Sequence, residues 1–404
     1  MFCKIKCNDL VRVVVVLKKL IARHTRLPLK KPIKHASHAR HETDNILIEC
    51  HLENGIVGYG EGVPRDYVTG ETVDSGLEVL RHSQLNGLTT VPATFTDAIN
   101  RIEQLPLRHP SSADARGIAT NAVRCAVELA YLDAMGRHFN EPLSTLTRLI
   151  TPELYELKSR IQYSVAITDA TGMKLFRQAL AYRLFGFTQC KVKVGIAGQD
   201  DGVRLRTIRK WMGQGMHLRV DANEAWKVED VASRWKELSP FNIAWVEQPV
   251  LHEAIGELAK VRKGMGMKVM LDESLCGMQD AQRCVAEGWG DLFNLRLSKC
   301  GGFIRTLRLA SYAYQHGLGC QLGCQVGESG ILSAGGRHFA CSVKGLQALE
   351  GSYDSWLVNE GLTARDMTFG WGGWAPALNE PGLGIVVDQA AIDRVTQRKE
   401  TILG

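Results

Sequence analysis

Two lysines one residue apart form the first arrangement in this chain that is able to do acid–base chemistry. Lys191 and Lys193 lie in the segment Cys190–Gly195 and alternate with valines, so in a strand both ammonium groups point to one face. Repulsion between them makes one proton easier to lose, which allows one lysine to act as a base near neutral pH. A solvated strand face has the same pattern, so the pair needs support from elsewhere in the chain.

Three acidic residues provide that support, because each stands at the end of a short apolar run. Asp221, Glu247 and Asp272 follow Lys191 at steps of 25 to 30 residues, and a fourth run leads to Arg296 after 24 more. One strand, one helix and two short loops need about that many residues. The period therefore predicts repeated βα units with a polar residue at the end of each strand.

A (β/α)8 barrel brings such strand ends together at one mouth, where its active site lies. Three carboxylates at the mouth would repel one another unless a hard divalent cation lay between them. Mg²⁺ is the natural candidate because it keeps coordination positions open for substrate oxygen, and Mn²⁺ would also serve. The same carboxylates could instead cap the following helices, but their register with the lysines favours a metal site.

Length and composition exclude several other classes. The 404 residues are enough for a barrel and a smaller domain, and 45% apolar and 23% charged residues are ordinary for a soluble globular protein. A net charge of +6 with 7% aromatic residues does not indicate a nucleic-acid binder. No apolar run approaches the roughly 20 residues of a membrane span. Eleven scattered cysteines without a Cys-x-x-Cys pair indicate a reduced, cytoplasmic protein.

We expect three parts in the chain: an α+β capping domain at residues 1–150, the barrel at 151–360 and a C-terminal segment at 361–404 that returns to the cap. In the cap, Asn-Gly between two alternating runs predicts a hairpin with its turn at Glu53–Gly55. The other elements expected are a strand near Val11–Ile21, a basic loop at Leu27–His41, a helix at Thr120–Arg137, and barrel strands from Arg160–Ala166 to Leu346–Leu349.

In this order and spacing, the motifs resemble the enolase superfamily, most closely the muconate lactonizing enzyme and dipeptide epimerase branch of the mandelate racemase/muconate lactonizing enzyme family. The fragments that carry the resemblance are Lys191-x-Lys193, Asp221-Ala222-Asn223, Glu247-Gln248-Pro249, Asp272-Glu273-Ser274, Lys299-x-Gly301-Gly302, Gly58–Glu61, Val68–Thr72 and Pro381–Gly384. The resemblance covers nearly the whole chain. It implies an α/β fold, a TIM-like barrel with an N-terminal α+β cap that the C-terminal segment completes.

The resemblance also implies the chemistry, which is Mg²⁺-dependent removal of a proton next to a carboxylate to give an enediolate. Asp221, Glu247 and Asp272 would hold the metal, Lys191 would add positive charge, and Lys193 would take the proton. A carbon acid of this kind is too weak for a lysine unless the developing charge is stabilised by many kcal/mol, which a metal ion can do.

Arg296 departs from the family pattern, because racemising members carry a second catalytic lysine at this position. Arginine keeps its proton, so Arg296 can steady an anion but is a poor base. This favours single-base chemistry by Lys193, meaning cycloisomerisation, elimination or dehydration. A racemase or epimerase of N-acylamino acids or dipeptides is the alternative, and a non-catalytic metal-binding barrel is an alternative of another class. Lys299 is expected to have a structural role. Strand alternation places its side chain on the opposite face of the strand, unless the strand has already ended.

The substrate is expected to be a small carboxylate with a second anionic group. Dipeptide epimerases hold an ammonium group with an Asp-x-Asp pair, but here Ser352 replaces one aspartate in Glu350–Asp354. A basic loop over the mouth would steer an anion. The residues expected to contact substrate are Asn223, Glu328, Asp354, Lys34, His35 and Thr69. As in related proteins, a homo-oligomer is expected.

Overall fold

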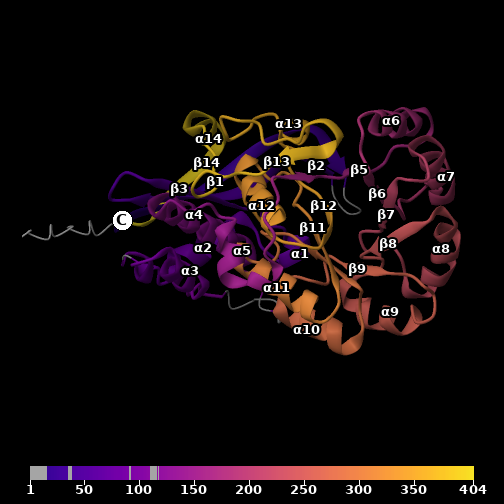
Figure 1. Cartoon of the computed structure of the whole chain (residues 1–404), viewed down its shortest axis with the longest axis horizontal. Coiled ribbons are helices and arrows are strands. Elements are labelled where there is room, and N and C mark those ends of the chain that lie inside the picture. Colours follow the sequence, from indigo (N-terminus) through magenta and orange to yellow (C-terminus); the bar gives the residue numbers. More distant parts are fainter. Residues whose placement is uncertain (1–15, 35–38, 91, 110–115, 117) are drawn as a thin grey trace, which may run out of the picture.

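A computed structural model describes the backbone of residues 16–34, 39–90, 92–109, 116 and 118–404, and the side chains of these residues except 32–34, 39 and 40. Most strands fall into two large sheets, which form a barrel and a cap (Figure 1). No helix in these described ranges has the length and apolar character needed to span a membrane.

The barrel is built from an eight-stranded parallel sheet in the order β12-β11-β10-β9-β8-β7-β6-β5. Its strands are β5 (Val165–Ile167), β6 (Gln189–Lys193), β7 (His217–Asp221), β8 (Ile243–Glu247), β9 (Val269–Leu271), β10 (Leu292–Leu295), β11 (Gly319–Leu322) and β12 (Leu346–Leu349). The two edges meet because the Ser164 backbone N–H, just before β5, donates to Leu349 O at the end of β12, at 2.8 Å. The predicted α/β barrel is confirmed.

Helices alternate with these strands and cover the outside of the barrel (Figure 1). They are α6 (Gly172–Leu184), α7 (Asp201–Met212), α8 (Val231–Leu238), α9 (Ile255–Val261), α10 (Met278–Glu287), α11 (Phe303–Gln315) and α12 (Gly330–Ser342). One strand, one helix and their loops make up each repeat, which explains the steps between the strand-end residues.

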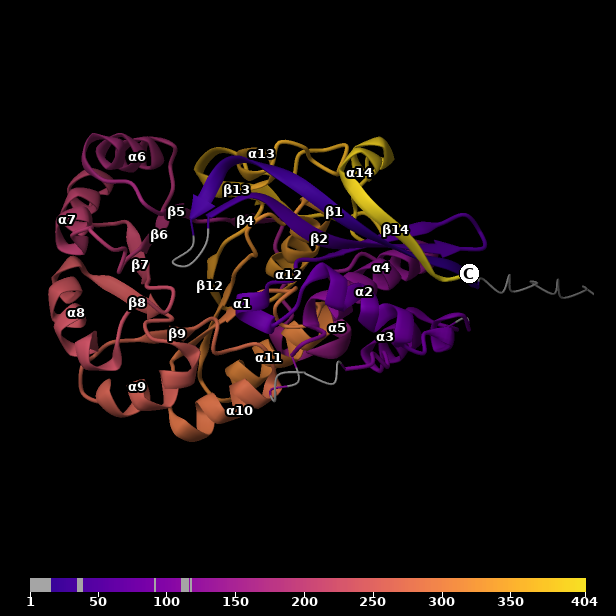
Figure 2. The ribbon, with the colours of Figure 1, turned by 180° about the vertical axis from the view of Figure 1, so that it is seen from behind.

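The cap contains a four-stranded sheet in the order β14-β1-β2-β3. Its strands are β1 (Leu17–Lys34), β2 (Ala39–Leu52), β3 (Val57–Gly62) and β14 (Thr396–Leu403). The remaining elements are α1 (Asp66–Thr69), α2 (Val73–His82), α3 (Phe95–Glu103), α4 (Asn121–Phe139), α5 (Thr145–Ile150), β4 (Arg160–Gln162), α13 (Asp354–Leu357), β13 (Trp374–Pro376) and α14 (Gln389–Val395). Seen from behind, the yellow C-terminal strand lies beside the indigo β1, with which it pairs (Figure 2).

Two expectations need correction, and a third lies partly outside the described residues. The segment Leu27–His41 is not a loop throughout, because β1 runs to Lys34 and β2 starts at Ala39. Its prolines interrupt the pairing only locally, where the β1–β2 register shifts between Pro28 and Ile33. The barrel begins at β5 and not at Arg160, because β4 pairs with β13 instead. Of the strand expected at Val11–Ile21, only residues from 16 onward lie within the described ranges.

Three alternating glycines let β3 lie directly on α4. A Cβ built on Gly60 would lie 2.1 Å from Ala126 O, and one on Gly58 would lie 2.3 Å from Ala130 O. The side of α4 that faces β3 carries alanines. The predicted helix and the hairpin between β2 and β3 are confirmed, and together they form the wall of the cap.

Gly60→Ala is therefore expected to lower the free energy of unfolding by about 2–3 kcal/mol, because the added methyl must push the backbone of α4 away. Urea denaturation followed by circular dichroism measures this change. Gly215→Ala is the matched control, since a Cβ at Gly215 would meet no described residue within 4 Å other than its chain neighbours. Equal stability of the two variants would contradict the packing described for β3.

Candidate functional site

The barrel strands β6 to β9 end in the ionisable residues that the sequence singled out. Lys193, the last residue of β6, pairs in register with Asp221, the last residue of β7. Asp221 pairs with Glu247 at the end of β8, and Asp272 directly follows β9. Lys191 lies two residues before Lys193 and so points to the same face. The parallel strands therefore bring all five side chains to one end of the barrel.

Lys191 lies at the centre of this cluster. Its Nζ is 3.2 Å from Asp221 Oδ2, 3.3 Å from Glu247 Oε1 and 2.8 Å from Glu350 Oε2. Burial opposes its charge, but the three carboxylates outweigh burial and raise the pKa of Lys191 well above its usual value. Lys191 is thus a permanent cation, suited to stabilise negative charge on a substrate and not to take a proton.

Lys193 differs from Lys191 in both contacts and charge. It is half-buried, and its Nζ makes no hydrogen bond within the described part of the chain. Burial is the largest influence and lowers the pKa of Lys193; repulsion from Lys191 adds to it, while Asp221 acts against it. The repulsion inferred from the sequence is therefore the smaller of the two effects. A lysine with a lowered pKa and a free amine is suited to act as a base.

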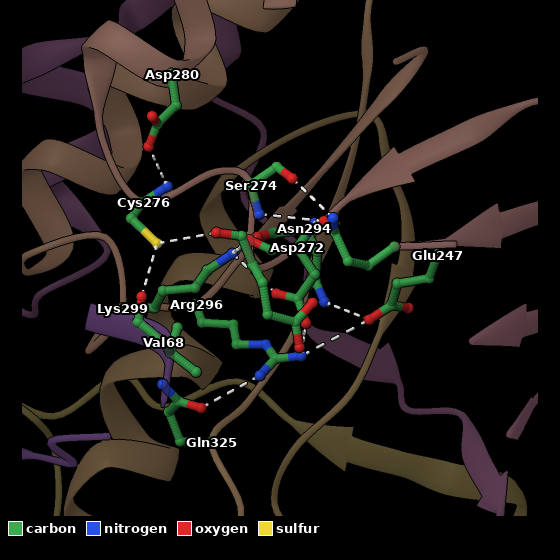
Figure 3. Close-up of polar contacts among 12 residues, drawn as sticks. Val68, Glu247, Asp272, Ser274, Cys276, Asp280, Asn294, Arg296, Lys299 and Gln325 are labelled. Carbon is green, nitrogen blue, oxygen red and sulfur yellow. Dashed lines mark hydrogen bonds and ion pairs between the residues drawn. The ribbon is translucent and has the colours of Figure 1, made fainter. Parts of the chain in front are cut away.

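Arg296 lies against two of the three carboxylates (Figure 3). Its Nη2 donates to Asp272 Oδ2 and lies 3.7 Å from Glu247 Oε1, while its Nη1 donates to Gln325 Oε1 at 3.2 Å. Burial opposes the charge, but Asp272, Glu273 and Glu247 raise the pKa of Arg296 well above its usual value. Its geometry is that of a fixed cation beside the carboxylates.

Lys299 holds Asp272 from behind. Its Nζ donates to Asp272 O at 2.7 Å, to Asp272 Oδ1 at 2.9 Å and to Asn294 O at 2.9 Å, and the side chain is fully buried (Figure 3). β10 has already ended at Leu295, so strand alternation does not decide where Lys299 points. These contacts fit the structural role expected for it.

The three carboxylates fit a divalent cation in chemistry, although cations of the protein lie between them. Lys191 joins Asp221 to Glu247, and Arg296 joins Glu247 to Asp272. Among the described residues, no group of three His, Cys, Asp or Glu side chains is arranged to hold a metal ion. Glu247 Oε2 is nevertheless buried and has no hydrogen-bond partner in the described part of the chain, and burial raises the pKa of Glu247. That oxygen lacks a positive neighbour, which a hard cation would supply.

Two of the six residues expected to contact substrate lie near each other beside α12. Glu328 accepts the Gln325 backbone N–H at 2.5 Å, and Asp354 accepts from Ser333 Oγ at 2.8 Å. Burial raises the pKa of Glu328 to about 8 and that of Asp354 to about 7. Glu328 also lines a cavity together with Glu350, which places it next to the partner of Lys191.

Of the other four residues expected to contact substrate, two belong to other elements and two have side chains that the structure does not describe. Asn223 follows β7 and donates its backbone N–H to Asp221 Oδ1 at 2.9 Å. Thr69 is buried in α1, where its hydroxyl donates to Arg65 O at 3.3 Å, so it stabilises its own turn. Lys34 ends β1, but its side chain is not described, and His35 lies outside the described residues. Contact of these residues with substrate stays a prediction.

Sequence reasoning missed the ion pair between Arg219 and Glu350. Arg219 Nη2 donates to Glu350 Oε1 at 2.8 Å and to Ser164 Oγ at 2.5 Å. Arg219 lies two residues before Asp221, so strand alternation alone could have placed it on the inner face. Glu350 directly follows β12 and could have been found by the strand-end rule that identified the three acids. The charges of Lys191 and Arg219 outweigh burial and lower the pKa of Glu350, so Glu350 stays charged.

Glu328→Gln is expected to reduce the dependence of stability on pH. Burial raises the pKa of Glu328 from 4.5 to about 8, so the native protein keeps a proton that the unfolded chain loses. The stabilisation is complete below pH 4.5 and disappears as the pH rises through 8. Between pH 5 and 8 the wild type should lose roughly 3.5 kcal/mol more than the variant. Urea titrations at both pH values measure this, with the exposed Glu257→Gln as control; parallel pH curves for wild type and Glu328→Gln would contradict it.

Comparison with known proteins agrees with this architecture. The N-terminal domain model of the mandelate racemase/muconate lactonizing enzyme family matches residues 18–147, and the enolase C-terminal domain-like model matches residues 174–391. An N-succinyl-L-Arg/Lys racemase of Bacillus cereus is 29% identical over 92% of this chain and 95% of its own. A hydrophobic dipeptide epimerase of Enterococcus faecalis is 29% identical over 82% of this chain and 88% of its own.

A solved structure shows the same fold. The crystal structure of a dipeptide epimerase from Enterococcus faecalis V583, complexed with Mg and the dipeptide L-Leu-L-Tyr, has a TM-score of 0.78 at 25% identity, over 92% of this chain and 99% of that one. The two family models together cover most of the residues of this chain, including every strand-end residue described above. The chain therefore belongs to the mandelate racemase/muconate lactonizing enzyme family of the enolase superfamily.

Proposed function

We propose that this protein is a Mg²⁺-dependent racemase or epimerase that removes the α-proton of an N-acylamino acid or a dipeptide. The observation that carries the proposal is the placement of a lysine with a lowered pKa, Lys193, beside the carboxylates at the barrel mouth. The similar proteins named above are a racemase and epimerases, which favours this function over cycloisomerisation or dehydration, the first expectation from the sequence.

The roles of the residues follow from their contacts. Asp221, Glu247 and Asp272 would hold Mg²⁺, or Mn²⁺ in its place, and the ion would stabilise charge on the substrate carboxylate. Lys191 adds a fixed positive charge next to Asp221 and Glu247. Lys193 takes the α-proton. Arg296, held by Asp272 and Gln325, adds a second positive charge on the side of β10.

An acylated amino group fits the site better than a free ammonium group. Glu350, one of the two acidic side chains left in Glu350–Asp354, is already paired with Lys191 and Arg219. Ser352 accepts a hydrogen bond at 3.0 Å from Arg337, which is buried. A further ammonium group would approach these cations, whereas an amide or a second carboxylate would be attracted. We therefore favour N-acylamino acids, including N-succinyl derivatives with their second anionic group.

The test is solvent deuterium exchange, followed by NMR with Mg²⁺, on N-succinylamino acids, N-acetylamino acids and dipeptides of both α-configurations. Exchange from both stereoisomers together with their interconversion is the expected result. Exchange from one stereoisomer without interconversion would instead favour the single-base lyase or cycloisomerase, for which Arg296 is the supporting observation. Binding of Mg²⁺ without exchange in any substrate would favour a non-catalytic barrel. That the protein is cytoplasmic and forms a homo-oligomer remains a prediction. Light scattering measures its state of assembly.

A further inference from the structure

A racemase needs a proton donor or acceptor on each side of the α-carbon, and Arg296 cannot provide the second one because it keeps its proton. Two other ionisable groups near the mouth are already engaged in hydrogen bonds. Lys299 donates three hydrogen bonds behind Asp272, and Tyr353 Oη donates to Ser164 O at 2.8 Å. The second group is therefore to be sought among the other side chains at the mouth.

Cys324 is a free thiol at the barrel mouth. It lies two residues beyond the end of β11 and is half-buried. A Cβ built on Gly351, just after β12, would lie 3.4 Å from Cys324 Cβ, so the thiol stands between the ends of these two strands. The charges that act on it are those of Glu328, Glu350, Arg296 and Lys191. Within the described ranges, its sulfur makes no hydrogen bond.

Cys324 and Lys193 approach the mouth from different sides. Going around the barrel, β5 and β12 separate β6 from β11 in one direction, and β7 to β10 separate them in the other. An independent observation points to a ligand at the mouth: Glu247 Oε2 is fully buried and has no hydrogen-bond partner among the described residues. A bound substrate would thus have the amine of Lys193 and the thiol of Cys324 at different faces.

We propose that Cys324 is the second acid–base residue and exchanges a proton with the α-carbon on the face opposite Lys193. This inference rests on the proposed racemase or epimerase function. In one direction, the Lys193 amine takes the α-proton and becomes an ammonium, and the Cys324 thiol gives its proton to the other face and becomes a thiolate. The substrate keeps its composition and inverts its configuration. The reverse reaction, or proton exchange with solvent, restores the amine and the thiol.

The charge state of the thiol agrees with this role. Burial, followed by Glu328 and Glu350, raises the pKa of Cys324 well above its usual value, so the resting thiol carries the proton that it must give. Lys193, with its lowered pKa, is the complementary base. A protonated acid on one side and a neutral amine on the other is the starting state that inversion requires.

Exchange measured separately from each stereoisomer tests the inference. In D2O with Mg²⁺, wild-type enzyme and variants are mixed with N-succinylamino acids of L and D configuration, and loss of the α-proton signal is followed by NMR. Lys193→Ala should lose exchange from one stereoisomer. Cys324→Ala should lose exchange from the other at least 100-fold while keeping the first within threefold. Cys324→Ser should behave like Cys324→Ala, because a hydroxyl is a far weaker acid than a thiol, and it retains the size of the side chain if the alanine variant folds poorly.

Cys320→Ala is the matched control, because Cys320 lies on the same strand nearer its other end and should not affect exchange from either stereoisomer. The inference is overturned if both Cys324 variants exchange both stereoisomers at the wild-type rate, or if they lose both equally, which would indicate a structural role. Absence of exchange in the wild type has a different meaning, since it overturns the proposed function itself and this inference with it.

Discussion

Lys193→Ala is expected to lower the rate of α-proton exchange about 10³-fold for the stereoisomer whose proton lies on the Lys193 side, because a positioned base contributes about 10²–10⁴-fold. The free amine and lowered pKa of Lys193 make it the base, whereas Lys191 is held as a cation by three carboxylates. The wild-type rate should rise with pH and reach a plateau below pH 10.5, the ordinary pKa of lysine. Deuterium incorporation followed by NMR measures both effects.

Two further variants separate the loss of the base from the loss of charge. Lys193→Arg keeps a positive charge next to Asp221 but cannot give up its proton, so it should be as slow as Lys193→Ala. Lys268→Ala removes an exposed lysine just before β9 and should leave the rate unchanged. Near-normal exchange in Lys193→Arg would show that Lys193 acts only through its charge, and another base would then have to be found.

The strand-end rule explains why so much of the barrel could be predicted from the sequence. In parallel strands the last residues lie at one edge, so Asp221 and Glu247 could be placed together without knowing any long-range contact. The same holds for the hairpin of β2 and β3, whose Asn-Gly turn is a local signal. These predictions depended on periodicity and turn chemistry, both of which act over a few residues.

Features set by contacts between distant parts of the chain could not be predicted in this way. β4 looks like a first barrel strand, but Trp374–Pro376 competes for its pairing, more than 200 residues away. Lys191 and Arg219 meet Glu350 only because the barrel closes between β5 and β12. The contact of Arg296 with Asp272 likewise depends on the neighbouring strand ends coming within reach. The residue types were enough to predict which strand ends form the barrel mouth. Which of these side chains pair with one another depends on the three-dimensional structure.

Removal of the metal is expected to have the largest effect of all, since exchange should fall below detection in EDTA and return with Mg²⁺. Without a divalent cation, Lys191, Arg296 and Lys299 are the cations that contact Asp221, Glu247 and Asp272 among the described residues. These groups stabilise the carboxylates, but none can coordinate a substrate oxygen as a metal does. The metal-free protein should therefore stay folded and be inactive, and a melting curve recorded with the exchange assay checks both points.

Glu247→Gln makes this expectation specific to one residue. At Mg²⁺ concentrations of about 100 Kd, binding should stabilise the wild type by about 2.7 kcal/mol, and the variant should lose most of that gain and about 10³-fold in exchange rate. In EDTA the variant should be at least as stable as the wild type, because burial raises the pKa of Glu247 and its Oε2 has no hydrogen-bond partner among the residues that the structure describes. The exposed Glu257→Gln should match the wild type in both buffers. If Mg²⁺ stabilised Glu247→Gln as much as the wild type, Glu247 would not be a metal ligand. If the variant were destabilised only in EDTA, Glu247 would act only as a partner of Lys191.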